Sequence, residues 1–195
     1  MRTLKIARRK AVALSVAGLA LTGVITTLGY LQGLQASGNF HPVVAGKAYR
    51  SAQPTAADLD RYQKLYGIKI VINLRGQSDG AEWYNQEIAA STRLGITHVD
   101  FRMSANRELS QQDAEALVRV MDGAEKPILI HCKAGSDRSG LASALYVAAV
   151  ERGSEEDAER QISLKYGHIS LPVSSTFAMD RTFEFLEPWL GYHDS

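Results

Sequence analysis

Three stretches of the chain have the apolar pattern of β-strands. Residues 68–74 (IKIVINL) and 128–130 (ILI) are short runs of aliphatic side chains, typical of strands buried on both faces of a sheet. Residues 96–103 (ITHVDFRM) alternate apolar and polar side chains, as a half-buried strand does. Residues 40–51 are also expected to be extended, although Gly46 interrupts them.

Helical periodicity separates these stretches. Apolar side chains recur every three or four residues, behind good N-caps and often before a glycine stop. The expected helices cover residues 55–66, 81–94, 110–121, 139–150, 154–166 and 174–187. Strands and helices that alternate with short connections imply an α/β fold, with a mostly parallel central sheet and helices on both faces.

The amino-terminal part has a different pattern. Residues 11–31 are apolar and uncharged, and as a helix they could cross roughly 30 Å of hydrocarbon. Five basic residues precede this run and few follow it closely, which favours a retained single-pass helix with a cytoplasmic amino terminus. The following domain is then outside the cytoplasm, in the periplasm if the host is bacterial. A cleaved signal peptide is the alternative, because residues 34–36 (LQA) loosely resemble a cleavage site.

We therefore expect a basic tail (residues 1–10), a transmembrane helix (11–31), a linker (32–39) and one folded domain (40–195). The chain has 22 basic and 21 acidic residues, and the five basic residues of the tail leave 17 against 21, a charge of −4. This balance argues against nucleic-acid binding. A single cysteine and histidines without ligand spacing predict neither a metal site nor a cofactor. Nothing in the sequence indicates an oligomeric state.

Residues 127–140, PILIHCKAGSDRSG, carry the strongest chemical signal. A buried strand ends at His131, a tight loop follows Cys132, and a helical pattern begins after Arg138. Loop N–H groups and a helix N-terminus can bind an anion such as phosphate, and the same field stabilises a thiolate at Cys132. Arg138 can bind two phosphate oxygens with its planar guanidinium. A buried structural cysteine would explain neither Gly135 nor Arg138.

His-Cys, five residues and Arg-Ser-Gly resemble the signature of the cysteine-dependent phosphatases, the protein tyrosine and dual-specificity superfamily. YRSAQP at 49–54 and INLR at 72–75 resemble the opening of atypical bacterial and fungal members, so the resemblance covers about residues 40–189. It implies a dual-specificity phosphatase-like fold and hydrolysis of phosphomonoesters through a phosphocysteine. A non-catalytic, membrane-tethered phosphate-binding module is the alternative from another class.

The resemblance also implies roles for individual residues. Cys132 is the expected nucleophile, and Arg138 stabilises the transition state. His131 is expected to hold the loop by hydrogen bonds, and the Ser139 hydroxyl to donate to the cysteine sulfur. The remaining loop residues expected to bind phosphate are Lys133, Ala134, Gly135 and Ser136.

Arg75 follows the carboxyl end of a predicted central strand, where ligands of open α/β sheets bind. It could help to hold a phosphate. Alternatively, it is a solvated loop residue or pairs with Asp79 or Glu82.

Two aspartates are candidates for the general acid that protonates the leaving oxygen. Asp137 lies in the loop, and Gly-x-Asp-Arg-Ser resembles myotubularin lipid phosphatases and some secreted bacterial tyrosine phosphatases, where this aspartate is assigned the acid role. Asp100 lies 32 residues before Cys132, about the offset of the acid in dual-specificity phosphatases. We favour Asp137, because the strand that contains Asp100 is expected to continue through Met103. Either aspartate could instead be structural.

The substrate class remains open at this level. A phosphoprotein is favoured, and a phospholipid or inositol phosphate at the membrane is the alternative. HCKAG resembles the loop of phosphoinositide and phosphatidylglycerophosphate phosphatases. Ser136 replaces a second loop lysine of the former group, which argues against a highly phosphorylated inositol.

Overall fold

A computed structural model describes residues 2–193, with side chains described for residue 15 and for residues 17–193. The chain divides into two compact units, Met1–Ala36 and Ser37–Ser195. The side chains of the expected basic tail lie outside the described set.

The first unit is a single helix, α1 (Arg2–Ala36). Its segment Ala17–Ala36 has 20 residues and a mean hydropathy of 1.3, enough for a candidate membrane span. A signal sequence would have the same length and composition. The helix includes residues 32–36 of the expected linker, because no proline or polar cluster ends it there, so only residues 37–40 precede the first strand.

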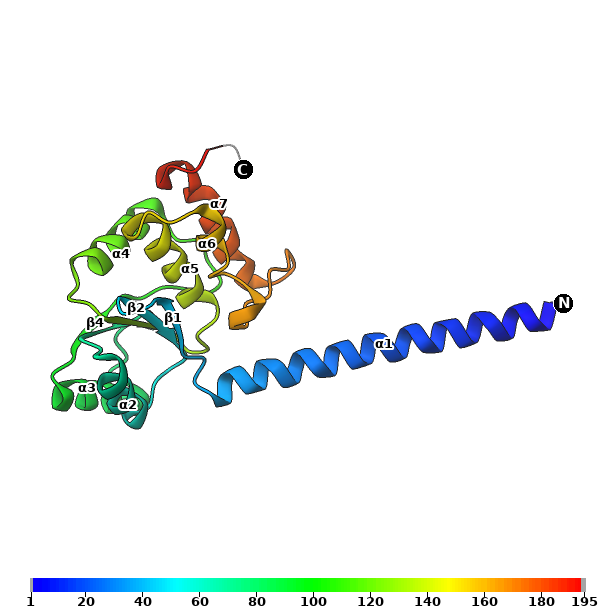
Figure 1. The fold of residues 1–195 in the computed structure, drawn as a ribbon, viewed down its shortest axis with the longest axis horizontal. Coiled ribbons are helices and arrows are strands. Elements are labelled where there is room, and N and C mark those ends of the chain that lie inside the picture. The colour runs from blue at the N-terminus through cyan, green and yellow to red at the C-terminus, as the bar shows by residue number, and fades with distance from the viewer. Residues whose placement is uncertain (1, 194–195) are drawn as a thin grey trace. The chain divides into compact units, whose positions relative to one another are not determined.

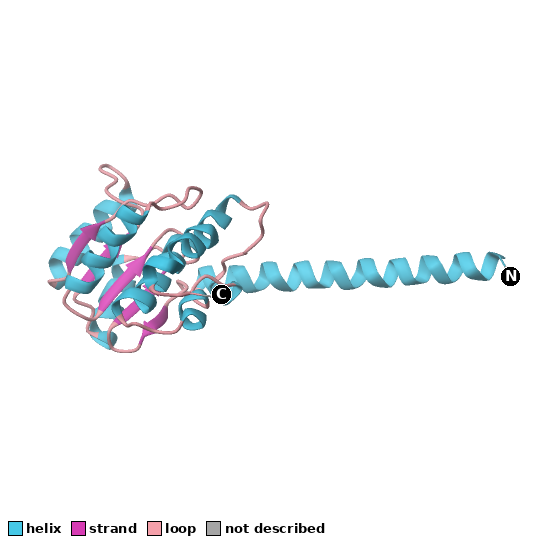
Figure 2. Ribbon diagram, turned by 90° about the horizontal axis from the view of Figure 1, so that it is seen from above, coloured by secondary structure: helices cyan, strands magenta, loops and turns pink. Residues whose placement is uncertain are grey.

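The second unit is built on a five-stranded sheet, coloured magenta in Figure 2. Its strands, in spatial order, are β1 (His41–Val44), β2 (Ala48–Ser51), β5 (Ile128–His131), β3 (Ile70–Asn73) and β4 (Thr97–Asp100). Every neighbouring pair is parallel except β1 and β2, which form a hairpin around Gly46. The predicted mostly parallel sheet is therefore confirmed, and the extended stretch 40–51 is two strands rather than one.

Helices cover both faces of this sheet, as predicted (Figure 1). One layer contains α2 (Ala56–Tyr66) and α3 (Glu82–Leu94), and the other contains α4 (Gln111–Gly123), α5 (Asp137–Leu145), α6 (Glu155–Glu159) and α7 (Ala178–Leu190). Successive side chains of the central strands point into opposite layers, as the pleat requires. Val71 and Leu129 pack with α2 and α3, whereas Ile72 and Ile130 pack with the helices of the other layer. All four are fully buried, which explains the continuous apolar runs in the sequence.

The helix boundaries follow local rules where the predictions were correct. Thr55 and Asp58 form a capping box at the start of α2, and Gly67 ends the helix with φ +69°. Ser110 caps α4 by accepting from the N–H of Asp113, and Gly95 ends α3.

Three predicted boundaries were wrong. The helix expected over 154–166 stops at Glu159, where the N–H groups of Gln161 and Ile162 donate three residues back to Ala158 and Glu159, and a 3₁₀ turn, Leu164–Tyr166, follows. The last helix continues through Pro188, in its final turn, to Leu190, and the N–H of Gly191 closes it by donating to the carbonyls of Glu187 and Pro188. Strand β4 ends at Asp100, although the N–H groups of Phe101 and Met103 still donate to the carbonyls of Asn73 and Leu74.

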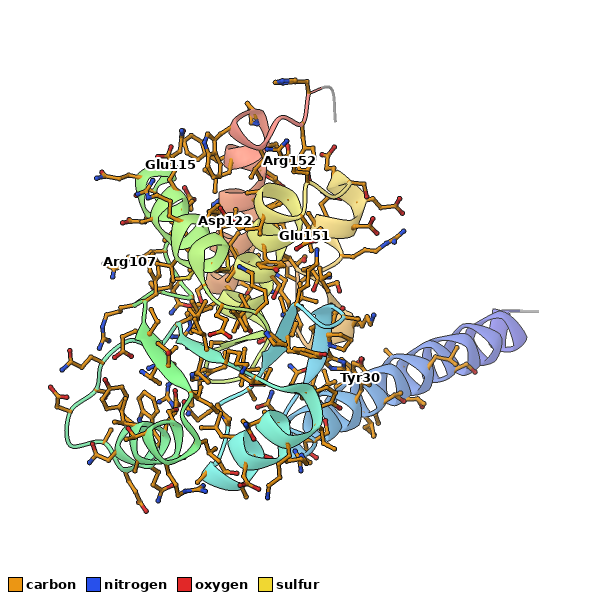
Figure 3. All side chains as sticks on the ribbon, turned by 60° about the vertical axis from the view of Figure 1, so that its left-hand side comes forward. Tyr30, Arg107, Glu115, Asp122, Glu151 and Arg152 are labelled. Carbon is orange, nitrogen blue, oxygen red and sulfur yellow. The ribbon has the colours of Figure 1, made fainter. Side chains whose placement is uncertain are left out.

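Helix α5 continues as a π-helical turn, Tyr146–Val150, whose end is tied to the β1–β2 hairpin. Glu151, labelled in Figure 3, accepts from Lys47 in the hairpin turn at 2.7 Å and from the Tyr146 hydroxyl at 3.2 Å. The helix behind the predicted anion loop is therefore attached to the sheet edge at its far end.

Candidate active site

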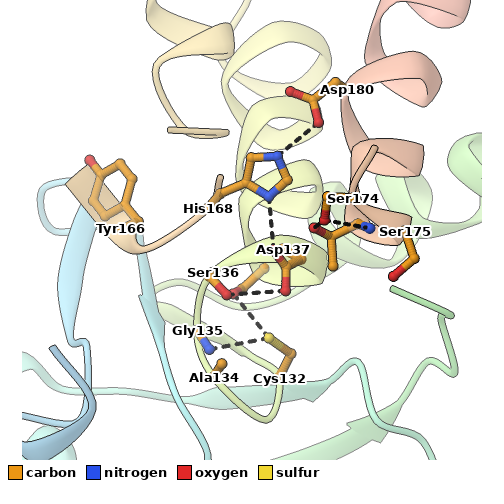
Figure 4. Close-up of polar contacts among 12 residues, drawn as sticks. Cys132, Ala134, Gly135, Ser136, Asp137, Tyr166, His168, Ser174, Ser175 and Asp180 are labelled. Atoms are coloured by element: carbon orange, nitrogen blue, oxygen red, sulfur yellow. Dashed lines mark hydrogen bonds and ion pairs between the residues drawn. The ribbon is translucent and has the colours of Figure 1, made fainter. Parts of the chain in front are cut away.

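The predicted strand–loop–helix arrangement is present. Strand β5 ends at His131, residues 132–136 form a loop, and α5 begins at Asp137. Cys132 is 2% exposed, and the N–H of Gly135 donates to its Sγ at 3.2 Å (Figure 4). The hydroxyl of Ser139 lies 3.4 Å from the same sulfur. Both contacts favour a negative charge on sulfur, because each group can donate to a thiolate.

Gly135 is required by the packing of the loop against the end of β2. It has φ +76°, and a Cβ there would lie 2.6 Å from the amide nitrogen of Ala52 and 2.8 Å from the carbonyl carbon of Ser51. Both contacts are shorter than a side chain tolerates, so any other residue would displace the loop.

A buried arginine that the sequence reasoning missed holds the loop from behind. Arg50, on β2, is fully buried and donates from Nη2 to the carbonyls of Gly135 and Ser136, both at 3.0 Å. Its Nη1 donates to the carbonyl of Gln161 at 2.6 Å, and its guanidinium stacks 4.1 Å from the ring centre of Tyr166. Burial lowers the pKa of Arg50 to about 10, so it stays charged at neutral pH. Because it occupies loop carbonyls, it leaves loop N–H groups available to an anion.

A second buried polar residue supports the same loop. The side-chain amide of Asn39 donates to the carbonyl of Ala134 at 3.0 Å and to the carbonyl of Tyr166 at 2.9 Å. Asn39 precedes β1, so segments from both ends of the domain fix the loop. The sequence offered little to identify these two residues as supports of the loop. Arg50 is a charged residue inside a short strand, and Asn39 is a single asparagine before the hairpin.

Arg138 and Arg75 carry two further guanidinium groups near the loop. Arg138 makes only long contacts, from Nη1 to the carbonyls of Leu74 and Met103 at 3.4 and 3.5 Å, and its buried Nε has no partner among the described residues. Arg75 donates to Gln53 Oε1 at 2.7 Å and stacks 3.4 Å over the ring of Trp83. Burial, and then the positive charge of Arg138, lower the pKa of Arg75. An anion bound between Arg75 and Arg138 would reduce the repulsion between their positive charges.

These contacts show the surroundings of Arg75, whose role the sequence leaves open. It is neither fully solvated nor bonded to Asp79, which instead accepts from Gln77. Lys133, in contrast, is exposed at the loop, and its carbonyl accepts from the N–H of Gln53 at 3.2 Å.

A buried carboxylate, also missed, connects α3 to this site. Glu87 is 1% exposed, and its Oε1 accepts from Nε2 of His131 at 2.9 Å and from Nε2 of His98 at 2.7 Å. Its other oxygen accepts from Gln53, the partner of Arg75. Burial would raise the pKa of Glu87, but the hydrogen bonds of the two histidines and of Gln53, with the charge of His131, lower it to about 2.

Glu87 therefore orients His131, beside Cys132, and Gln53 at the same time. Its signal in the sequence was a charged residue on the inner face of a helix whose other buried residues are Tyr84, Ala90 and Ser91.

The two candidate acids have different surroundings. Asp137 lies in the first turn of α5, where Oδ1 is 2.8 Å from Nδ1 of His168 and Oδ2 accepts from the Ser136 hydroxyl at 3.2 Å. Asp100 accepts from the side-chain amide of Asn73 at 2.7 Å and from the Tyr84 hydroxyl at 2.6 Å.

The sheet also separates Asp100 from the loop. Asn73 is paired with Asp100 on one side and with His131 on the other, so Asp100 and His131 are two strands apart, about 10 Å. The geometry brings Asp137, rather than Asp100, to the loop.

A cysteine between a strand and a helix N-terminus, in a loop closed by an arginine, defines the class of cysteine-dependent phosphatases. The model of the tyrosine phosphatase family matches residues 30–158, and the chain belongs to this family. The resemblance in the sequence is thereby confirmed.

A curated relative is the dual specificity protein phosphatase TpbA of Pseudomonas aeruginosa. It is 35% identical over 107 residues, which are 53% of this chain and 44% of TpbA. The match spans less than half the length of that relative.

Solved structures show the same fold. Crystal structures of P. aeruginosa TpbA, one of them in complex with phosphotyrosine, have a TM-score of 0.60 at 22% identity, and cover 80% of this chain and 92–93% of theirs. PTPMT1 in complex with PI(5)P has a TM-score of 0.58 at 17% identity, and covers 77% of this chain and 97% of its own.

The buried Glu87 leads to the first prediction. Glu87→Gln should lower the free energy of unfolding by about 1.5–3 kcal/mol at pH 7, because it removes charged hydrogen bonds to the buried His131 and the partly buried His98. The pKa of Glu87 is lower in the folded protein than the ordinary 4.5, so its contribution is present at neutral pH and is lost as the pH falls from 4.5 towards 2. Urea denaturation of both proteins at several pH values should show their difference shrinking over that range. Glu82→Gln, exposed on the same helix, is the control, and an equal effect there would contradict the assignment.

Proposed function

We propose that this chain hydrolyses phosphomonoesters as a cysteine-dependent phosphatase of protein tyrosine or dual-specificity type. The observation that carries the proposal is the Cys132 sulfur, which accepts from Gly135 N–H at 3.2 Å in a loop whose carbonyls are bound by Arg50. A thiolate there attacks phosphorus, so that an S–P bond forms while the ester P–O bond breaks. Loop N–H groups and Arg138 stabilise the charge on the equatorial oxygens.

The remaining residues complete the cycle. Asp137 gives a proton to the leaving oxygen, and water then hydrolyses the phosphocysteine and releases phosphate. The Ser139 hydroxyl, 3.4 Å from the sulfur, stabilises the thiolate as it leaves. His131 holds the loop through Glu87, and Arg75 and the exposed Lys133 add positive charge for the substrate. No step requires a cofactor.

A phosphotyrosine or other phosphoprotein is the substrate we favour, in keeping with the phosphotyrosine bound to TpbA. The PI(5)P bound to PTPMT1 supports the alternative, a phospholipid or inositol phosphate at the membrane. Ser136, where a second loop lysine would add charge, argues for the less charged phosphoprotein. A non-catalytic phosphate-binding module would bind the same groups without turnover.

We also propose that α1 is a retained anchor and that the domain lies outside the cytoplasm. The candidate span Ala17–Ala36 and the five basic residues before residue 11 support this orientation.

The catalytic proposal is tested with the detergent-solubilised chain. It should hydrolyse p-nitrophenyl phosphate in the presence of a chelator, be inhibited by vanadate, and lose at least about a thousandfold in kcat in Cys132→Ser. The variant should still bind phosphotyrosine peptide, since Arg138 and the loop N–H groups remain. Metal-dependent turnover that survives the substitution would contradict the proposal, and binding without turnover in the unmodified chain would support the binding module.

Leaving-group kinetics separate the two aspartates. Asp137→Asn should lower kcat/KM about a hundredfold for phenyl phosphate, whose leaving group is poor, but only a few-fold for p-nitrophenyl phosphate, because an activated leaving group needs no proton. Asp100→Asn should be nearly neutral with both substrates. The opposite order would transfer the acid role to Asp100.

The orientation is tested by fusing reporters after Ser195 of the full chain. Alkaline phosphatase fused there should be active, and a reporter that fluoresces only in the cytoplasm should be dark. Immunoblotting of the fusion measures cleavage, because a removed signal peptide would shorten the protein by roughly 35 residues. Cytoplasmic fluorescence would refute the orientation, and the shorter band would refute the retained anchor.

A further inference from the structure

His168 is a fully buried histidine that no step above uses. It lies between two carboxylates from different helices, with Nδ1 2.8 Å from Oδ1 of Asp137 on α5 and Nε2 2.8 Å from Oδ2 of Asp180 on α7 (Figure 4). Each ring nitrogen faces a carboxyl oxygen, so a protonated ring can donate at both positions. The three side chains form a line that ends at the anion loop.

We propose that His168 is a positioning residue for the general acid, which it holds by one carboxylate oxygen while Asp180 holds His168 from the other side. This inference rests on the proposed role of Asp137. The imidazolium binds Oδ1, so the carboxyl group has one orientation and Oδ2, beside Ser136, is the oxygen that can carry the catalytic proton.

The charge of His168 fits the chemistry of the proton transfer. During cleavage the O–H bond at Asp137 breaks, its proton moves to the leaving oxygen, and the electron pair of the P–O bond stays on that oxygen. Asp137 becomes a carboxylate at this moment, and the imidazolium 2.8 Å away stabilises it. His168 keeps its own proton throughout, and bulk solvent later returns a proton to Asp137.

The groups around this line favour the charged ring. Burial would lower the pKa of His168, but the hydrogen bonds and charges of Asp137 and Asp180 raise it. Asp180 also lines a cavity of about 240 Å³ together with Glu159, on α6, and Glu184, on α7. The pKa of Glu159 is raised by its burial and by neighbouring glutamates, which indicates a negative potential there. Arg50, on β2, is the opposing positive charge near Asp137.

This arrangement was not predicted from the sequence. His168 and Asp180 lie 31 and 43 residues after Asp137, beyond the region that the family model matches.

The test is the pH dependence of kcat/KM for phenyl phosphate in the full chain. In the proposed mechanism the alkaline limb of this profile reports the loss of the catalytic proton. His168→Gln removes the imidazolium that stabilises the carboxylate of Asp137, so the alkaline limb should move up by about 1–2 pH units. At the pH optimum, kcat/KM of His168→Gln should fall about tenfold for phenyl phosphate and less than threefold for p-nitrophenyl phosphate. Asp180→Asn should move the limb in the same direction by less, and it keeps a buried hydrogen-bonding group if His168→Gln does not fold.

Glu184→Gln is the matched control, because it removes a charge from the same cavity without a described contact to His168. An unchanged limb in folded His168→Gln and Asp180→Asn, or an equal shift in the control, would overturn the inference. Nitrogen-15 NMR of the imidazole decides the charge without turnover. A ring that is neutral at pH 7 would also overturn it, whereas absence of turnover in the unmodified chain would contradict only the catalytic proposal.

Discussion

The buried charge of Arg50 is the interaction on which the rest of the site depends. A guanidinium without solvent is costly unless its donors are satisfied; here the two terminal nitrogens donate to backbone carbonyls of Gly135, Ser136 and Gln161, whereas Nε has no partner among the described residues. These bonds connect the loop to the turn that follows α6, and Tyr166 packs over the guanidinium. Because the acceptors are neutral, the positive charge is retained, and it adds to the field that Arg138 and Arg75 create at Cys132.

Both layers of the domain contribute to this loop. From the layer of α2 and α3, Glu87 fixes His131 directly before the nucleophile. From the opposite layer, the line of Asp180 and His168 reaches Asp137 directly after the loop. The loop is therefore held at both ends by hydrogen bonds between a histidine and a carboxylate, one pair in each layer, so a disturbance in either layer affects the geometry at the sulfur.

The parts predicted from the sequence are those that local rules determine. The fourteen residues from Pro127 to Gly140 contain a strand, a loop and a helix start, as their pattern predicts, and the resemblance to the phosphatases adds the expected roles of Cys132 and Arg138. The sheet followed from β-branched runs, and the helix ends from Thr55, Gly67 and Ser110.

What the sequence could not indicate depends on long-range contacts. Arg50 meets Gln161 across 111 residues, and Glu87 meets His131 across 44. The apolar pattern also extended a helix to Tyr166, whereas the chain leaves the helix at Glu159. The distance of Asp100 from the loop depends on the strand order, which places β3 between them.

The single cysteine also determines how this site responds to oxidation. Cys132 is the chain's one thiol, and a sulfenic acid formed on it has no second cysteine in the chain with which to form a disulfide. Reduction therefore depends on a thiol from another molecule. Since the sulfur is 2% exposed at the base of the anion loop, that reductant, like an oxidant, must enter where phosphate binds. Phosphate in the loop would shield the sulfur from the oxidant and from the reductant. In an oxidising compartment, the time for which Cys132 stays reduced therefore depends on the fraction of time that phosphate occupies the loop.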